Sequence, residues 1–287
     1  MTASVLFDAP GPRTVARHRL YTVVSLVALT GLVAFVVWTM YDTGQLEYEL
    51  WEPIVTPAYV EYILVNGLLE TLKMAFFSII FAVVFGLVFG VAKLSDRPWI
   101  RWPAWLVVEF FRAVPVLLLM VFLFFLLAIG DGVLTSFWCV VIALTLYNGS
   151  VLAEVFRAGV NAVPAGQGEA AYAIGMRKSQ VMISVLLPQA IKIMLPAIIS
   201  QMVVALKDTS LGYYILAPGL TAVAKPIYLE FNNQVQVAIV ITGIYVAVNL
   251  VLTWVATMVQ KRLVGEKSPL ELSRVGNMQG GDNTGAA

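Results

Sequence analysis

Two groups of polar side chains interrupt apolar stretches of this chain, and their types suit the binding of a charged ligand. Glu109 and Arg112 are spaced i, i+3, so on a helix they lie on one face and can form an ion pair. An arginine guanidinium can also bind a carboxylate through two parallel hydrogen bonds. Arg112 is therefore either a contact for the carboxylate of a ligand or one half of a structural ion pair.

The second group consists of Lys207, Asp208, Thr209 and Ser210, which follow one another at the end of another apolar stretch. Their charges match those of a zwitterion, and their hydroxyls can satisfy backbone groups where a helix unwinds at a transport site. The alternative is a plain loop at the membrane interface. Glu154, near the inner end of a further apolar stretch, is either a solvated carboxylate or a residue that lines a path.

Composition indicates that these polar residues belong to an integral membrane protein. Hydrophobic residues make up 60% of the 287 residues, charged residues only 12%, and the mean hydropathy is +0.87. A soluble domain usually has about 25% charged residues. The formal net charge of +1 gives no basic field, so nucleic acid is not expected as a partner, whereas membrane lipid is.

The residues needed for common catalytic and metal sites are missing from the sequence. The chain has a single histidine, His18, and a single cysteine, Cys139, and it contains no phosphate-binding loop and no zinc-binding H-E-x-x-H motif. We therefore expect no catalytic residue, no metal and no cofactor on this chain. The energy for uphill transport has to come from another protein.

Apolar stretches predict an all-α fold with six transmembrane helices. Pro115 is expected to kink the third helix, and Gly86 to let another helix pack closely against the second. Segment 212–234 is expected to be an outer or re-entrant segment. The six predicted helices are 21–41, 65–92, 102–128, 133–155, 188–206 and 235–259.

The distribution of charge predicts which ends of these helices face the cytoplasm. Segment 42–61 is rich in acidic residues and has no Lys or Arg, whereas the segments after the second, fourth and sixth helices are basic. Basic loops lie on the cytoplasmic side of membranes. This places both termini in the cytoplasm, with a polar tail at 1–20 and a disordered tail at 263–287.

A polar segment at 168–188 lies on the same cytoplasmic side. Residues 169–174 favour a short helix, Gly175 tolerates the positive φ of a turn, and a second helix is expected to begin near Lys178. Small alanines would let another protein approach closely. The segment is either a helix-turn-helix that docks a partner or a connecting loop that happens to be helical.

The spacing within this segment resembles the EAA-type coupling motif of ABC importer permeases. Glu169-Ala170-Ala171 is followed after three residues by Gly175, and after nine more by Val185, where isoleucine is usual. The resemblance covers 66–262 and points to the polar amino-acid uptake subgroup. The other segments that carry it are Arg157-Ala158-Gly159, Gly166-Gln167-Gly168, Leu187-Pro188-Gln189-Ala190 and Lys207-Asp208-Thr209-Ser210-Leu211.

The resemblance implies a five-helix importer core at 62–262, preceded by an extra N-terminal helix at 21–41. It implies a plasma-membrane protein that works with a second permease subunit, identical or related, and with an extracytoplasmic substrate-binding protein. An ATPase subunit dimer would hold ATP and magnesium and receive the helix-turn-helix. The residues expected to couple to it are Gln167, Gly168, Glu169, Ala170, Ala171, Gly175, Arg177 and Lys178.

The resemblance also implies a polar amino acid as the substrate. The family commonly has threonine in the segment that here reads Arg112-Ala113-Val114-Pro115, and this departure resembles glutamate uptake permeases of actinobacterial kind. Glutamate or aspartate is therefore the expected substrate. The alternative is an ion-gradient-driven secondary transporter or channel. The residues expected along the substrate path are Glu109, Arg112, Glu154, Lys207, Asp208, Thr209 and Ser210.

Overall fold

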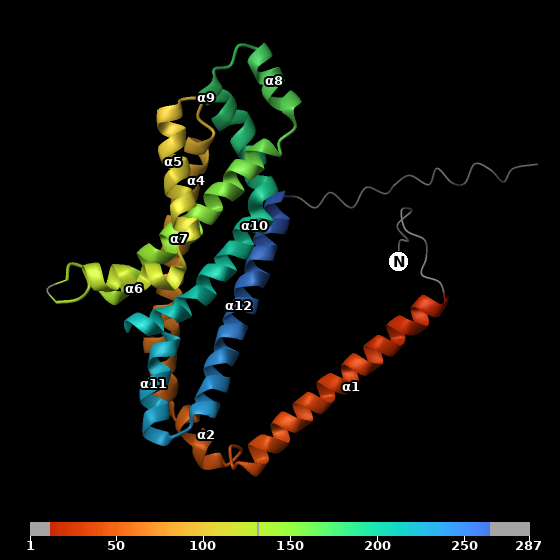
Figure 1. Ribbon diagram of the computed structural model, residues 1–287, viewed down its shortest axis with the longest axis vertical. Coiled ribbons are helices and arrows are strands. Elements are labelled where there is room, and N and C mark those ends of the chain that lie inside the picture. The colour runs from red at the N-terminus through yellow and green to blue at the C-terminus, as the bar shows by residue number, and fades with distance from the viewer. Residues whose placement is uncertain (1–11, 131, 265–287) are drawn as a thin grey trace, which may run out of the picture.

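The computed structural model describes residues 12–130 and 132–264, and all regular secondary structure in these residues is helical (Figure 1). The predicted C-terminal tail therefore lies almost wholly outside the described residues, as do residues 1–11. The helices are α1 (Pro12–Asp42), α2 (Tyr48–Val55), α3 (Pro57–Tyr62), η1 (Ile63–Leu69), α4 (Glu70–Lys93), α5 (Pro98–Ala113), α6 (Val116–Leu127), α7 (Ser136–Asn161), α8 (Ala165–Ala173), α9 (Lys178–Gln180), η2 (Val181–Leu186), α10 (Leu187–Asp208), η3 (Thr209–Ile215), α11 (Leu220–Phe231) and α12 (Gln234–Val264).

Five helical segments are long and apolar enough to cross a membrane, and a bent pair of helices could form a sixth span. Helices α3, η1 and α4 run without a break, as do α9, η2, α10 and η3, because each helix begins at the residue after the last one ends. These segments extend beyond the predicted helices 65–92 and 188–206 at both ends. The all-α prediction is confirmed for the described residues.

The predicted third helix is two helices, α5 and α6, that meet at an angle of 101°. Helix α5 ends at Ala113, and Val114 and Pro115 both have extended backbone, with ψ of 127°. Proline has no N–H to donate and disfavours helical backbone at the residue before it. The expected kink is therefore a break, and α6 projects sideways from the other helices (Figure 1).

Helices α4 and α7 cross at very close range and form the centre of the structure. A Cβ atom on Gly86 would lie 2.6 Å from Cβ of Leu152, and one on Gly90 would lie 2.8 Å from the carbonyl oxygen of Ala153. The close approach predicted for Gly86 is confirmed. Only residues without a side chain let two helix backbones come this near.

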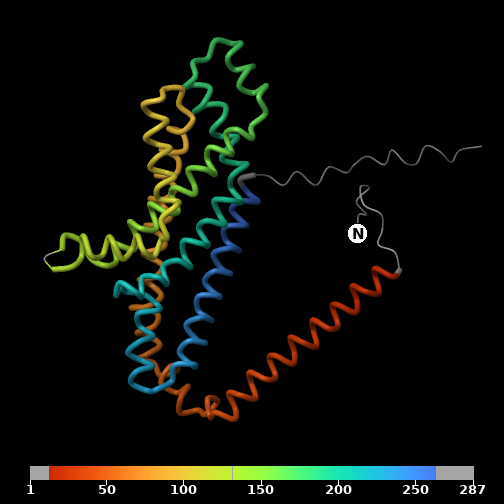
Figure 2. The backbone as a smooth tube through the Cα atoms, viewed as in Figure 1, coloured from red at the N-terminus to blue at the C-terminus, as the bar shows by residue number. Residues whose placement is uncertain are grey.

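Segment 212–234 forms the end of η3 and then helix α11, which packs against η1 and α12 through buried Leu220, Val223 and Ile227. The backbone N–H of Leu220 donates to Oγ1 of Thr71, 2.9 Å away, so a buried hydroxyl on α4 satisfies a free N–H at the start of α11. Helices α2 and α11 lie at one end of the bundle, and α8 and α9 at the other (Figures 1 and 2).

Helix α1 extends away from the other helices, and its apolar side chains are exposed (Figure 2). It begins at Pro12, inside the predicted tail 1–20. The turn after α1 is held by Gln236 of α12, whose Nε2 donates to the carbonyl oxygen of Gln45, 2.6 Å away. This contact fixes the point from which α1 leaves the rest of the chain.

Candidate functional site

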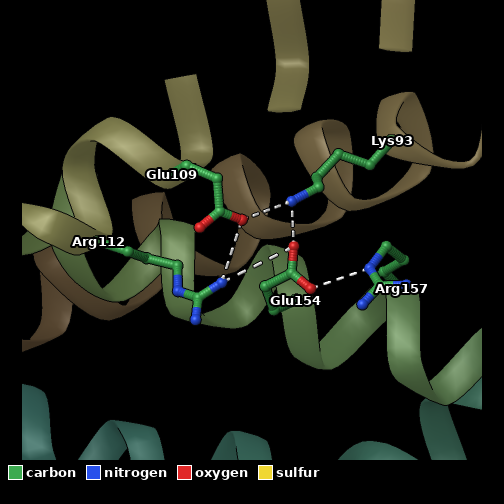
Figure 3. Close-up of polar contacts among 5 residues, drawn as sticks. All are labelled: Lys93, Glu109, Arg112, Glu154 and Arg157. Atoms are coloured by element: carbon green, nitrogen blue, oxygen red, sulfur yellow. Dashed lines mark hydrogen bonds and ion pairs between the residues drawn. The ribbon is translucent and has the colours of Figure 1, made fainter. Parts of the chain in front are cut away.

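Five charged side chains from three helices form one network, which we call the ion cluster (Figure 3). Lys93 of α4 contacts Glu154 of α7 and lies 3.1 Å from Glu109 of α5. Arg112 lies 3.4 Å from Glu109 and 3.9 Å from Glu154. Arg157 lies 2.9 Å from the second carboxylate oxygen of Glu154. Each carboxylate therefore faces at least two cations.

Helix packing explains why these charges meet. Glu109 and Arg112 are one turn apart on α5, Glu154 and Arg157 are one turn apart on α7, and Lys93 is the last residue of α4. The Lys93 side chain is buried between the two carboxylates. Charges removed from water are costly unless they are paired, so the cluster ties α4 and α5 to α7.

A cavity of about 530 Å³ adjoins the ion cluster. Three cationic and two anionic side chains line it, which leaves one positive charge in excess. Two tryptophans complete a wall that is partly apolar. Such a surface can bind a small molecule that carries both carboxylates and an ammonium group. The lining residues are Lys93, Arg101, Trp102, Trp105, Glu109, Glu154 and Arg157.

The sequence predicted part of this site. The pairing of Glu109 with Arg112 on one helical face is confirmed. Glu154 is not an isolated interfacial carboxylate, because it lies against that pair. Lys93 and Arg157 were missed as site residues. The i, i+3 spacing of Glu154 and Arg157 was a usable signal, whereas nothing in the sequence brings Lys93 to α5 and α7.

The four polar residues at 207–210 lie apart from the ion cluster. Helix α10 ends at Asp208, and 3-10 turns continue from Thr209, so the segment tightens instead of unwinding. Buried Thr209 donates to the carbonyl oxygen of Leu206, 2.6 Å away. In the part of the chain that the structure describes, no ion pair or hydrogen bond joins this group to the ion cluster.

Two of these four residues, Lys207 and Ser210, instead line cavities along α12. Lys207 borders one of about 320 Å³ together with Tyr245 and Asn249. Ser210 borders one of about 670 Å³ that also contains Tyr213 and Thr242. The structure therefore divides the predicted path residues into a charged group between α4, α5 and α7, and a hydroxyl-rich group between α10, α11 and α12.

Helices α8 and α9 form the predicted helix-turn-helix, which we call the hairpin. Gly175 has φ of +83°. Its N–H donates to the carbonyl oxygen of Tyr172 at 2.9 Å, and the N–H of Met176 donates to the carbonyl oxygen of Ala171 at 3.2 Å. These two bonds close helix α8 in a Schellman motif, which requires left-handed backbone at the glycine. Glu169 and Ala170 are exposed, as are the larger apolar side chains Tyr172 and Ile174.

Contacts on the opposite face hold the hairpin to the rest of the protein. Ala171 is buried, and Nε2 of Gln189 on α10 lies 3.4 Å from Oε1 of Gln167. Lys178 forms an ion pair with Asp96, in the turn between α4 and α5. Asp96 was missed by the sequence analysis, because its partner is far away in the sequence.

Comparison with known proteins finds a matching family model and several relatives of this chain. Residues 79–265 match the family described as binding-protein-dependent transport system inner membrane component. The chain is 41% identical over 227 residues to the glutamate transport system permease protein GluD of Corynebacterium glutamicum, which covers 77% of this chain and 82% of GluD. It is 30% identical over 227 residues to the octopine transport system permease protein OccM of Rhizobium meliloti, across 76% of this chain and 90% of OccM.

The fold is also similar to solved structures. A crystal structure of an amino acid ABC transporter with histidines superposes with a TM-score of 0.64 at 29% sequence identity. That match covers 71% of this chain and 95% of the other. The names of these relatives differ in the compound they carry.

Proposed function

Because this chain belongs to the family of binding-protein-dependent transport system inner membrane components, and is a multi-pass permease subunit of an amino-acid ABC importer, we propose that it carries an acidic amino acid, glutamate or aspartate. The family assignment replaces the alternative of an ion-gradient-driven transporter or channel. It leaves the identity of the substrate to be argued from the site.

The observation that carries this proposal is the excess of positive charge beside the ion cluster. The cavity is lined by three cations and two carboxylates, and a free glutamate or aspartate at neutral pH carries one net negative charge. The carboxylates Glu109 and Glu154 would face the substrate ammonium, and the cations its two carboxylates. The 41% identity to a glutamate permease supports the same choice.

Arg112 is not among the residues that line this cavity, but it contacts both carboxylates that do. We assign it a substrate contact because its side chain is more exposed than that of Lys93, the other cation paired with Glu109. Its guanidinium meets one oxygen of Glu109 at 3.4 Å and one of Glu154 at 3.9 Å, so neither contact uses a two-bond geometry. Donors therefore remain for a substrate carboxylate. The group Lys207, Asp208, Thr209 and Ser210, which no ion pair joins to the ion cluster in the described residues, would line a later or earlier part of the path.

The coupling proposal assigns the hairpin to an ATPase subunit dimer that holds ATP and magnesium. The exposed residues Glu169, Ala170 and Tyr172 give it a charged and apolar surface that no other part of the described chain covers. The end with α2 and α11 would then face an extracytoplasmic substrate-binding protein. This orientation puts both termini in the cytoplasm, and a second permease subunit would complete the pathway.

The substrate is tested by binding to the purified complex of this chain with its ATPase, without the binding protein, using radiolabelled glutamate and unlabelled competitors. We expect aspartate to compete, and arginine and histidine not to. Arg112→Ala should abolish binding while the ATPase still co-purifies, and Arg97→Ala, at the residue before α5 and outside the ion cluster, should change neither. Equal competition by arginine would refute the choice of an acidic substrate.

The coupling role is tested separately with Glu169→Arg combined with Gly175→Pro. Proline cannot adopt positive φ, so the turn of the hairpin is lost together with one exposed charge. We expect the ATPase no longer to co-purify, while the permease still reaches the membrane at its normal level. Unchanged association would show that the ATPase binds elsewhere.

A further inference from the structure

The turn that joins α4 to α5 contacts three different parts of the molecule within four residues. Lys93, at its start, lies in the ion cluster between Glu109 and Glu154. Leu94 packs against the apolar cluster that buried residues of α4, α7 and α10 form. Asp96 forms an ion pair with Lys178, the first residue of α9 in the hairpin. Figure 1 shows the hairpin and this turn at the same end of the bundle.

Hydrogen bonds within the turn make it a compact unit. The N–H of Leu94 donates to the carbonyl oxygen of Val91 at 3.0 Å, and that of Ser95 to the carbonyl oxygen of Ala92 at 3.1 Å. The N–H of Arg97 donates to Oγ of Ser95 at 3.2 Å. Because few residues separate Lys93 from Asp96 and their backbone is bonded to itself, a displacement at Asp96 reaches Lys93 without being absorbed by loose chain.

The ion pair itself is too exposed to be a major source of stability. The Asp96 side chain is 78% exposed and that of Lys178 is 47% exposed. Pairs of this kind contribute about 0 to 1 kcal/mol, because water screens the charges. This ion pair adds little to the stability of the fold, but it joins the hairpin to the helices of the ion cluster. A role in passing movement from the hairpin to those helices explains it better than a role in stability.

We propose that Asp96 and Lys178 are positioning residues that transmit movement of the hairpin to the ion cluster through the α4–α5 turn. The inference rests on the proposed function, since it requires that the hairpin docks on the ATPase. Closure of the ATPase would move α9 and, through Lys178, Asp96. Lys93 would then shift between Glu109 and Glu154, which changes the charges that face the cavity.

Charge reversal tests the proposal in the complete transporter, reconstituted in liposomes with its ATPase and binding protein. The variants are Asp96→Lys, Lys178→Asp and the double swap, and the readouts are substrate imported and ATP hydrolysed in the same sample. Each single reversal should lower the substrate imported per ATP by about twofold to fivefold, the range that an exposed pair allows. The double swap restores the pair with opposite polarity and should return the ratio to that of the wild type.

A matched control reverses a partly exposed lysine–carboxylate pair, Glu70 and Lys73, whose Oε1 and Nζ lie 2.7 Å apart on α4, away from the hairpin. Its single reversals should leave the import ratio unchanged. Co-purification of the ATPase is measured for every variant, because this separates the two proposals. If the ATPase does not co-purify with the wild-type chain, the proposed coupling role of the hairpin is wrong.

Three results would overturn the transmission role while leaving the proposed function standing. In one, the single reversals import as much substrate per ATP as the wild type. In another, the single reversals lower the substrate imported per ATP but the double swap does not restore it, so that the two charges act independently. In the last, Asp96→Lys loses the ATPase itself, which would make Asp96 part of the docking surface.

Discussion

Replacing Lys93 with methionine is the most direct test of the ion cluster. Methionine fills a similar volume but carries no charge. The Lys93 side chain is 5% exposed and lies between Glu109 and Glu154, which are 38% and 20% exposed. Removing one partner of a buried pair costs about 3 to 5 kcal/mol, because the other charge is left without compensation.

The cost here should be lower than that range. Glu154 keeps Arg157 at 2.9 Å, and Glu109 keeps Arg112 at 3.4 Å. We therefore expect a loss of about 2 kcal/mol, which for a chain of this size lowers the midpoint of thermal unfolding by about 4 to 8 °C. The double variant Lys93→Met, Glu154→Gln should lose less stability than the sum of the losses of the two single variants. The difference, which is the coupling energy of the two residues, should be about 1 to 2 kcal/mol.

The assay is thermal unfolding of the purified permease, followed by the fluorescence of its 7 tryptophans. Lys192→Met is the matched control, because Lys192 is exposed on α10 and has no ion pair within residues 12–130 and 132–264. It should shift the midpoint by less than about 1 °C. A Lys93→Met protein as stable as the wild type, or strictly additive losses, would refute the account of the cluster.

Three further substitutions test other parts of the structure. Gly175→Ala places a side chain at φ of +83° and should destabilise the hairpin by about 1 to 2 kcal/mol, read as faster hydrogen exchange in α8 and weaker binding of the ATPase. Gly86→Ala should destabilise the protein by about 1 to 3 kcal/mol in thermal unfolding, whereas Gly243→Ala, with open space around it, should not. Thr71→Val leaves the N–H of Leu220 unsatisfied and should cost about 1 to 3 kcal/mol, with the faster exchange confined to the start of α11.

Local chemistry was enough to predict the long apolar helices of this protein, apart from the third, which is broken. Apolar stretches long enough to span a membrane predict helices whatever their neighbours are, because backbone groups in lipid must bond within the segment. The hairpin was predictable for a similar reason. Gly175 supplies a backbone conformation that other residues resist, and its spacing from Glu169 is fixed by the motif.

The sequence did not determine where the chain breaks between α5 and α6 or how sharply it turns. Pro115 marks the position, but a proline in an apolar stretch is compatible with a mild kink or with a break. The angle of 101° follows from how α6 packs against α7 and η3. That packing involves residues far away in the sequence, so no local pattern reports it.

The sequence by itself determined the class of the protein, most of its long apolar helices and the pairing of Glu109 with Arg112, since each depends on residues within a few turns of one another. The tertiary structure alone decided that Lys93 and Glu154 join that pair, that residues 207–210 do not, and that Asp96 meets Lys178. The physical reason is that charges act across space. Lys93 meets Glu154 because α4 crosses α7, and Gly86 and Gly90, in the two turns of α4 before Lys93, permit that close crossing.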